Sequence, residues 1–189
     1  MIRKKEITAA ELMAQLRQDP EFCAREKLQE EELKRREQLS RIEQAQLLSE
    51  LREVGVVVDS VWDLVNTRAE YPAAIPVLVR HLSNSYTRGV KEGIARALTV
   101  EYAGPEALRK FIDEFLKQDD NSGISLKWVL GNAIATVATS SDEEAMISLA
   151  TDRAHGVARE PIIAQLRRVV KDRKRLKRIL AQLAAESDV

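Results

Sequence analysis

The sequence predicts an all-α protein built mainly of helix pairs that repeat along the chain. The residues that lose least on entering a helix (Ala, Leu, Glu, Lys and Arg) dominate the 189 residues, whereas Gly and Pro number only seven and five. Short polar joints separate the apolar segments, and short joints imply antiparallel neighbouring helices. A third observation is a short fragment that occurs three times.

The repeated fragment is VKEGIARAL at residues 90–98, which returns as LKWVLGNAI at 126–134 and, less closely, as VAREPIIAQL at 157–166. Aligned on a basic residue, the copies share an apolar residue three positions later and another seven positions later. One helix pair cannot bury its own apolar face, so this spacing predicts a short α-solenoid of antiparallel pairs. The matched sets are Lys91, Lys127 and Arg159; Ile94, Leu130 and Ile162; Leu98, Ile134 and Leu166; and the small pair Ala97 and Ala133.

This order of basic, apolar, small and apolar positions resembles that of HEAT repeats, especially the short bacterial type, over about residues 58–184. The chain as a whole, including DPEF (19–22), EGIARAL (92–98) and DRAHG (152–156), is also similar to bacterial HEAT-like proteins of uncharacterised function. Tetratricopeptide repeats fit less well, because their Trp, Gly, Tyr and Pro positions are not reproduced. The resemblance implies a fold and no mechanism.

A long charged helix is predicted ahead of the repeats, over about residues 20–54, after a short helix that ends near Pro20. Asp19 can cap it, Pro20 suits its first position, and Gly55 suits the position after its end. We expect a solvated surface helix, with a projecting or self-associating arm as the alternative, and two domains at 1–55 and 56–189. Four i,i+4 ion pairs support the helix: Glu30–Lys34, Glu31–Arg35, Glu32–Arg36 and Glu37–Arg41.

The helices of the repeat domain follow from apolar periodicity between turn signals. Asp59 or Ser60 can cap the first, Pro72 and Pro105 suit later helix starts, and Asp119–Gly123 is expected to be a loop. The expected helices are VWDLVN (61–66), AAIPVLVRHL (73–82), TRGVKEGIARALTV (87–100), EALRKFIDEFLKQ (106–118), SLKWVLGNAIATVA (125–138), EEAMISLATD (143–152), VAREPIIAQLRRVV (157–170) and RKRLKRILAQLAAE (173–186).

No residue pattern in the sequence indicates catalysis, so we expect no enzyme, no cofactor and no metal. His81 and His155 do not adjoin a Glu, which argues against the HEAT-like hydroxylases that bind iron through His-Glu pairs. We expect His81 to be structural and His155 to lie in a more exposed loop. Cys23, the single cysteine, has no neighbouring His and is interpreted as a buried or inert thiol. No glycine-rich phosphate loop or nucleophile elbow occurs.

Two other HEAT-like families offer enzymatic alternatives. Phycobilin lyases act with partner proteins that this sequence cannot reveal. HEAT-like DNA glycosylases place Trp and Asp at the lesion, for which the candidates would be Trp62, Asp63, Trp128 and Arg159. Both Trp residues fall at helix positions that core packing explains, and no glycosylase motif can be matched residue by residue.

The first functional hypothesis is a non-catalytic scaffold or adaptor that binds another protein on one row of repeat helices. Repetition without a reactive constellation favours this interpretation, and Trp and Arg are preferred anchors at interfaces. The row would contain Lys91, Glu92, Arg96, Lys127, Trp128, Asn132, Arg159 and Glu160.

The second hypothesis concerns the basic segment at residues 153–178, where ten Lys and Arg stand against two acidic residues in a chain of zero net charge. This segment could be the outer face of a terminal helix, whose apolar face would hold Leu176, Ile179, Leu180 and Leu183. It could instead dock on an acidic surface, including a second copy of the chain, or bind nucleic acid, although it lacks aromatic residues for base stacking. The candidate residues are Arg167, Arg168, Lys171, Lys174, Arg175 and Arg178.

The expected location is the cytoplasm, without membrane insertion. A single cysteine fits a reducing compartment. The first residues lack the apolar region of a signal peptide, and no apolar run reaches the length of a membrane span.

Overall fold

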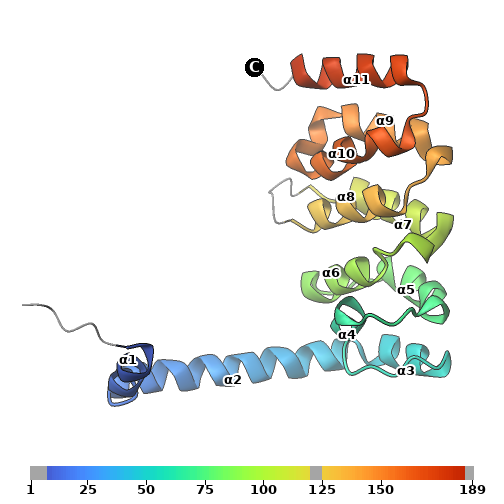
Figure 1. The fold of residues 1–189 in the computed structure, drawn as a ribbon. Helices are drawn as coiled ribbons and strands as arrows, with labels where there is room; N and C mark the ends of the chain where they lie inside the picture. Colours follow the sequence, from blue (N-terminus) through green and yellow to red (C-terminus); the bar gives the residue numbers. More distant parts are fainter. Residues whose placement is uncertain (1–7, 120–124, 186–189) are drawn as a thin grey trace, which may run out of the picture. The chain divides into compact units, whose positions relative to one another are not determined.

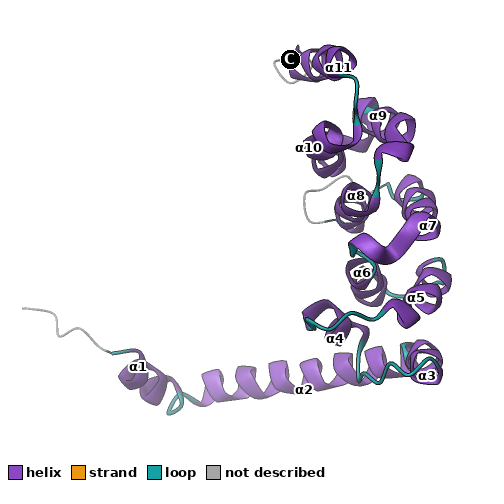
Figure 2. Ribbon diagram, turned by 45° about the vertical axis from the view of Figure 1, so that its right-hand side comes forward, coloured by secondary structure: helices purple, strands orange, loops and turns teal. Residues whose placement is uncertain are grey.

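The computed structural model describes residues 8–119 and 125–185, which form eleven α-helices and four short 3₁₀ helices (Figures 1 and 2). No strand occurs among these residues, so the predicted all-α class is confirmed. The chain divides into two compact units, Met1–Glu43 and Gln44–Val189.

The first unit contains α1 (Ala9–Leu16) and α2 (Pro20–Glu43). Asp19 caps α2 as predicted, because its Oδ1 accepts the backbone N–H of Glu21 at 2.9 Å. No residue of α2 is buried. Its surface carries the predicted Glu30–Lys34 pair at 2.6 Å and the Glu32–Arg36 pair, so local ion pairing supports a helix with little packing beneath it.

The predicted helix over residues 20–54 is in fact two elements, because α2 ends at Glu43 and α3 spans Ala45–Glu53. The side chain of Gln44, between them, is buried and accepts the N–H of Val61 at 2.9 Å. Leu47 and Leu51 of α3 are fully buried. These residues therefore belong to the second unit, which begins at Gln44 and not at the expected residue 56.

The end of α3 agrees with the prediction for Gly55, which has φ +83. The Gly55 N–H donates to the carbonyl of Arg52 at 3.0 Å, and the Val56 N–H donates to that of Leu51 at 2.9 Å. These two bonds form a Schellman motif, which satisfies helix-end carbonyls and favours Gly at the left-handed position.

The remaining helices lie close to their predicted ranges. Ser60, one of the two predicted caps, closes a capping box with Asp63 at the start of the first of them. The predicted loop Asp119–Gly123 lies mostly outside the described residues. The helices are α4 (Val61–Asn66), α5 (Ile75–Leu82), α6 (Arg88–Ala97), α7 (Gly104–Leu116), α8 (Leu126–Val137), α9 (Glu143–Thr151), α10 (Glu160–Val169) and α11 (Arg173–Ala185).

Within the second unit the helices pack as the pairs α5–α6, α7–α8 and α9–α10. Consecutive pairs also touch: α4, α6, α8 and α10 follow one another in contact, and so do α3, α5 and α7 (Figure 2). The repeated apolar positions form the core between them, since every one has an exposed fraction of 0%. They are Ile94, Ala97, Leu98, Leu130, Ala133, Ile134, Ile162 and Leu166.

Gly131 marks a close approach between neighbouring pairs. A Cβ on this residue of α8 would lie 2.3 Å from the carbonyl oxygen of Ala158, just before α10. Backbone cannot move aside as a flexible side chain can, so α8 and the entry to α10 come this close only because Gly131 has no side chain.

We expect Gly131→Ala to lower the free energy of unfolding by about 1–3 kcal/mol, because the added methyl group overpacks a rigid contact. The matched control is Gly89→Ala in α6, where an added Cβ would meet nothing within 4 Å. That change should leave stability unchanged or raise it by less than about 1 kcal/mol. Urea unfolding of both variants measures the difference, and equal stabilities would contradict the inferred contact.

Candidate functional site

The three aligned cations of the repeated fragment contact other helices of the same chain. Lys91 Nζ on α6 lies 2.6 Å from Glu114 Oε2 on α7. Lys127 on α8 is only 5% exposed, and its Nζ lies 5.2 Å from the centroid of the Phe115 ring, also on α7. Arg159, which precedes α10, donates from Nη1 to the carbonyl of Ala150 on α9 at 3.0 Å. These three members of the predicted partner-binding row therefore serve the contact between helices.

Glu114 is the acidic centre of this arrangement, with an exposed fraction of 1%. Its two carboxylate oxygens accept bonds from Lys91 at 2.6 Å and from Lys117 at 2.7 Å. Burial acts to raise the pKa of Glu114, but the hydrogen bonds from Lys117 and Lys91 outweigh it and hold the pKa below its usual range. The carboxylate is therefore charged and doubly paired inside the fold.

The other members of the predicted row lie on the same succession of helices. Glu92 and Arg96 pair with each other along α6 at 2.8 Å. Trp128 is partly buried and packs against the core, and Asn132 is half-buried on the same helix. Glu160 is exposed in the first turn of α10. A partner-binding role for these five residues stays a prediction.

His81 is structural in its contacts, as its position in an amphipathic helix suggested. The ring is buried; Nε2 lies 3.1 Å from Glu50 Oε2 on α3, and Nδ1 lies 2.6 Å from the Tyr86 hydroxyl. Hydrogen bonds from Arg80, then His81 and Gln46, lower the pKa of Glu50 to about 2. This network ties α3 to α5.

His155 is buried, which corrects the expectation of an exposed loop histidine. Its ring is 6% exposed and meets the Phe115 ring edge-to-face at 4.8 Å between centroids. Its Nδ1 has no hydrogen-bond partner among the described residues. Burial and the nearby charge of Lys127 lower the pKa of His155, against an opposing effect of Asp152. The DRAHG segment is therefore packed against the end of α7.

The residues considered for a glycosylase site have other partners in the fold. Asp63 Oδ2 accepts the N–H groups of Asp59 and Ser60, both at 3.0 Å. Trp62 is 36% exposed, less buried than core packing suggested. Cys23 is also exposed, whereas a buried thiol was one expectation. In the described part of the chain, no group of three His, Cys, Asp or Glu side chains could hold a metal ion.

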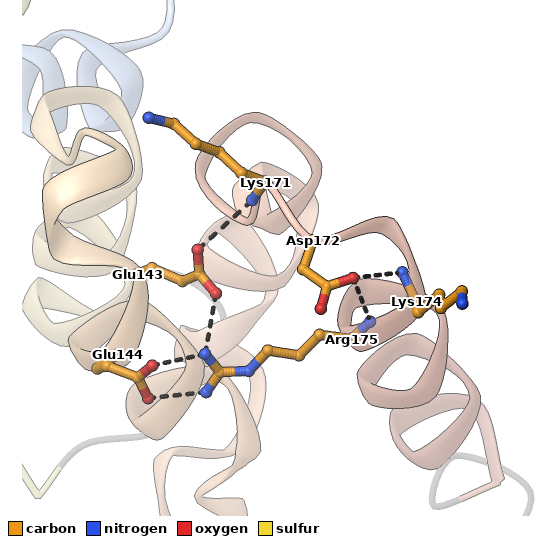
Figure 3. A network of polar contacts seen from close by, with 6 residues as sticks. All are labelled: Glu143, Glu144, Lys171, Asp172, Lys174 and Arg175. Carbon is orange, nitrogen blue, oxygen red and sulfur yellow. Dashed lines mark hydrogen bonds and ion pairs between the residues drawn. The ribbon is translucent and has the colours of Figure 1, made fainter.

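Arg175, one of the six predicted basic-site residues, fastens α11 to α9 (Figure 3). Its guanidinium donates to Glu143 Oε1 at 3.0 Å. It also donates to both carboxylate oxygens of Glu144, with Nη2 at 2.8 Å from Oε2. The hydrogen bond from Arg175 is the main cause that lowers the pKa of Glu144. Arg175 is therefore engaged in the contact between α9 and α11, and a partner-binding role for it stays a prediction.

Further hydrogen bonds from backbone N–H groups to Asp172 and Glu143 hold the start of α11 in place. Asp172 Oδ1 accepts the N–H groups of Lys174 at 2.8 Å and Arg175 at 3.2 Å, which caps α11. The Lys171 N–H donates to Glu143 Oε2 at 3.4 Å. Leu176 and Leu183 are buried, and Ile179 and Leu180 pack against the core, so the predicted apolar face of α11 is confirmed.

The remaining cations form what we call the basic surface. Arg168 Nη2 donates to the carbonyls of Ala135 and, at 3.1 Å, Thr136, at the end of α8. Among the described residues, no partner is found for the side-chain nitrogens of the cations in 167–178 other than Arg168 and Arg175. The basic surface consists of Arg167, Arg168, Lys171, Arg173, Lys174, Lys177 and Arg178, all exposed.

A pocket of about 430 Å³ opens in the basic surface between the end of α10 and the start of α11. Arg173, which sequence reasoning counted among the basic residues but left out of the site, is one of its four cationic lining residues. Nothing in the sequence says which cations around the joint point into one hollow. The lining residues are Arg167, Arg168, Val170, Lys171, Arg173 and Leu176.

Comparison with models of protein families, with curated proteins and with solved structures yields no match to this chain. Among the described residues, no helix has both the length and the apolar character that a membrane span requires.

We expect Glu114→Gln to reduce the free energy of unfolding by about 1–3 kcal/mol near neutral pH, because the buried lysine contacts lose their charged acceptor. A Glu with a lowered folded pKa contributes stability above its unfolded pKa, about 4.3, and loses it as pH falls through the folded pKa. The variant and the parent should therefore converge in acid. Urea unfolding across pH tests this, with the exposed neighbour Asp113→Asn as control; a pH-independent gap would contradict it.

We expect Arg175→Gln to speed amide hydrogen exchange in α11, because the bonds to Glu143 and Glu144 that join α11 to α9 are lost. Exchange in α7 and α8 should be unchanged. Mass spectrometry of peptides from each helix measures the effect, and Lys177→Gln, an exposed change on the same helix, is the control. Unaltered protection of α11 would show that its apolar face alone holds it.

Proposed function

We propose that this chain is a non-catalytic adaptor that binds an acidic segment of another protein through the basic surface of α10 and α11. The main support is the pocket between these helices, where the side-chain nitrogens of Arg167, Lys171 and Arg173 have no partner among the described residues. Unpaired cations in a hollow add little to folding and attract negative charge.

The cations elsewhere on the predicted row support this choice of surface. Lys91, Lys127 and Arg159 are engaged with α7 and α9, so a partner would have to break those contacts to use them. The basic surface needs no such rearrangement, because the fold is held there by Arg175, Asp172 and Leu176.

As the architecture of the adaptor we propose a short α-solenoid of the HEAT-like kind. The support is the repeated burial of the same positions in α6, α8 and α10, and the contact of each pair with the next. A stack of this kind buries a continuous core while leaving its terminal helix available as a charged cap. Self-association through α2 and a cytoplasmic location remain predictions.

Nucleic-acid binding by the same surface is the second candidate, favoured by the eight surplus positive charges of residues 153–178. Phosphate neutralisation of this kind makes affinity fall steeply with salt. None of the described residues that line the pocket is aromatic, so base stacking has no support there.

A glutamate-rich peptide and a duplex oligonucleotide of equal charge, both fluorescently labelled, distinguish the two functions. We expect the full chain to retain the peptide at about 0.15 M salt, where screening has weakened diffuse attraction. The combined change of Lys171, Arg173 and Lys174 to Gln should weaken it at least about tenfold, which is the loss of contacts to charged acceptors. The control changes the exposed Arg52, Arg68 and Arg109 to Gln.

Two results would contradict the adaptor. One is tighter binding of the oligonucleotide than of the peptide, which would favour the second candidate. The other is equal weakening by the control variant, which would show that overall charge and not the basic surface sets the affinity.

A further inference from the structure

The pocket between α10 and α11 combines clustered cations with two aliphatic residues. Four of its six lining residues are cationic: Arg167 and Arg168 from the end of α10, Lys171 from the joint and Arg173 from the start of α11. Its two other lining residues, Val170 and Leu176, are 4% and 9% exposed. Cations from three consecutive segments and two aliphatic residues therefore line the same pocket.

The acidic residues near this hollow are already occupied. Asp172 accepts the two N–H groups at the start of α11, and Glu143 accepts from Arg175 and from the Lys171 N–H (Figure 3). Glu144 is gripped by Arg175. None of these three carboxylates forms an ion pair with a cation of the lining among the described residues.

Part of the lining is held in place by contacts within the protein. Arg168 is positioned by the carbonyls of Ala135 and Thr136 at the end of α8. The Arg175 contacts fix the start of α11, and with it Arg173, relative to α9. A donor that is fixed in advance loses less entropy on binding, which applies to Arg168 among the four cations.

We propose that this pocket binds the phosphoryl group of a phosphorylated side chain on a partner protein, which rests on and deepens the adaptor function. A phosphomonoester carries nearly two negative charges and three acceptor oxygens, and arginine forks bind it in a bidentate manner. A carboxylate carries one negative charge and two acceptor oxygens, so it matches a lining of four cations less well. The carbon atoms of the phosphorylated residue would lie against Val170 and Leu176.

The shape and lining favour a protein ligand over nucleic acid. The hollow is local to the α10–α11 joint, whereas a nucleic-acid backbone presents phosphates along a line. Lys174, Lys177 and Arg178 lie on α11 outside the pocket lining and would be used by an extended polyanion. Recognition of a phosphorylated motif by a cluster of Arg residues needs the pocket alone.

The test uses a labelled peptide mixture with a central phosphoserine and randomised flanks, beside the same mixture with Asp or Ser at the centre. Binding to the full chain is followed by fluorescence anisotropy at about 0.15 M salt. The pocket variant changes Arg167, Lys171 and Arg173 to Gln. The matched control changes Lys174, Lys177 and Arg178 to Gln, which removes the same charge from the same surface. Thermal melts confirm that both variants fold.

We expect the phosphoserine mixture to bind at least about tenfold more tightly than the Asp mixture, and the pocket variant to lose at least that factor. The control variant should lose less than about threefold, as expected for charges that only steer a ligand.

Other outcomes overturn the inference in distinguishable ways. Equal affinity for the phosphoserine and Asp mixtures rejects phosphoryl recognition and leaves the acidic-partner function standing. Equal losses in the two variants reject the pocket as the site. Binding of a labelled duplex oligonucleotide, with none of any peptide mixture, rejects both proposals.

Discussion

Cations at the carboxyl ends of α7 and α9 add polar contacts to the apolar core of the second unit. At the last turn of α7, Lys91 reaches Glu114 from α6 and Lys127 covers the Phe115 ring from α8. Arg159 instead binds a backbone carbonyl, that of Ala150 near the end of α9. The last carbonyls of a helix lack partners within the helix and carry partial negative charge, so a cation near a helix end is attracted there and, in the case of Arg159, satisfies one of them. This contact joins the two rows of helices.

The same requirement explains why the fragment returns with a basic residue and not only with apolar ones. Ile94, Leu130 and Ile162 fill the core, and the packing of such side chains favours a small set of angles between helices. A cation that contacts a residue at the end of a neighbouring helix adds a directional contact to this packing. What the sequence presents as a row of charges for a partner is therefore, at three positions, part of the packing.

The apolar part of the fold could be predicted from the sequence because burial has a period. The eight repeated apolar positions, the cap at Ser60 and the glycine after α3 all follow from local chemistry. The interruption at Gln44 could not, since its partner is the N–H of Val61, which lies beyond the next joint. Gly131 is similar, because the atom that forbids a side chain there belongs to Ala158.

The candidate site shows the same limit. Counting charges located the basic segment and five of the cations that stay on its surface, because composition is visible in the chain. The predicted site included Arg175, which binds Glu143 and Glu144 on α9, and left out Arg173, which lines the pocket. A long basic side chain can turn inward or outward from the same backbone position, so only the neighbours of each residue decide its role.

The seam between α10 and α11 has one more consequence. Arg167 and Arg168 belong to one side of the seam and Arg173 to the other, so an anion lodged among them would pull two helices together. Its binding and the docking of α11 would then be a single linked equilibrium. At a free concentration a hundred times its dissociation constant, such a ligand would stabilise the state with α11 docked by about 2.7 kcal/mol. Binding of the anion would therefore favour docked α11, and docking of α11 would favour binding of the anion.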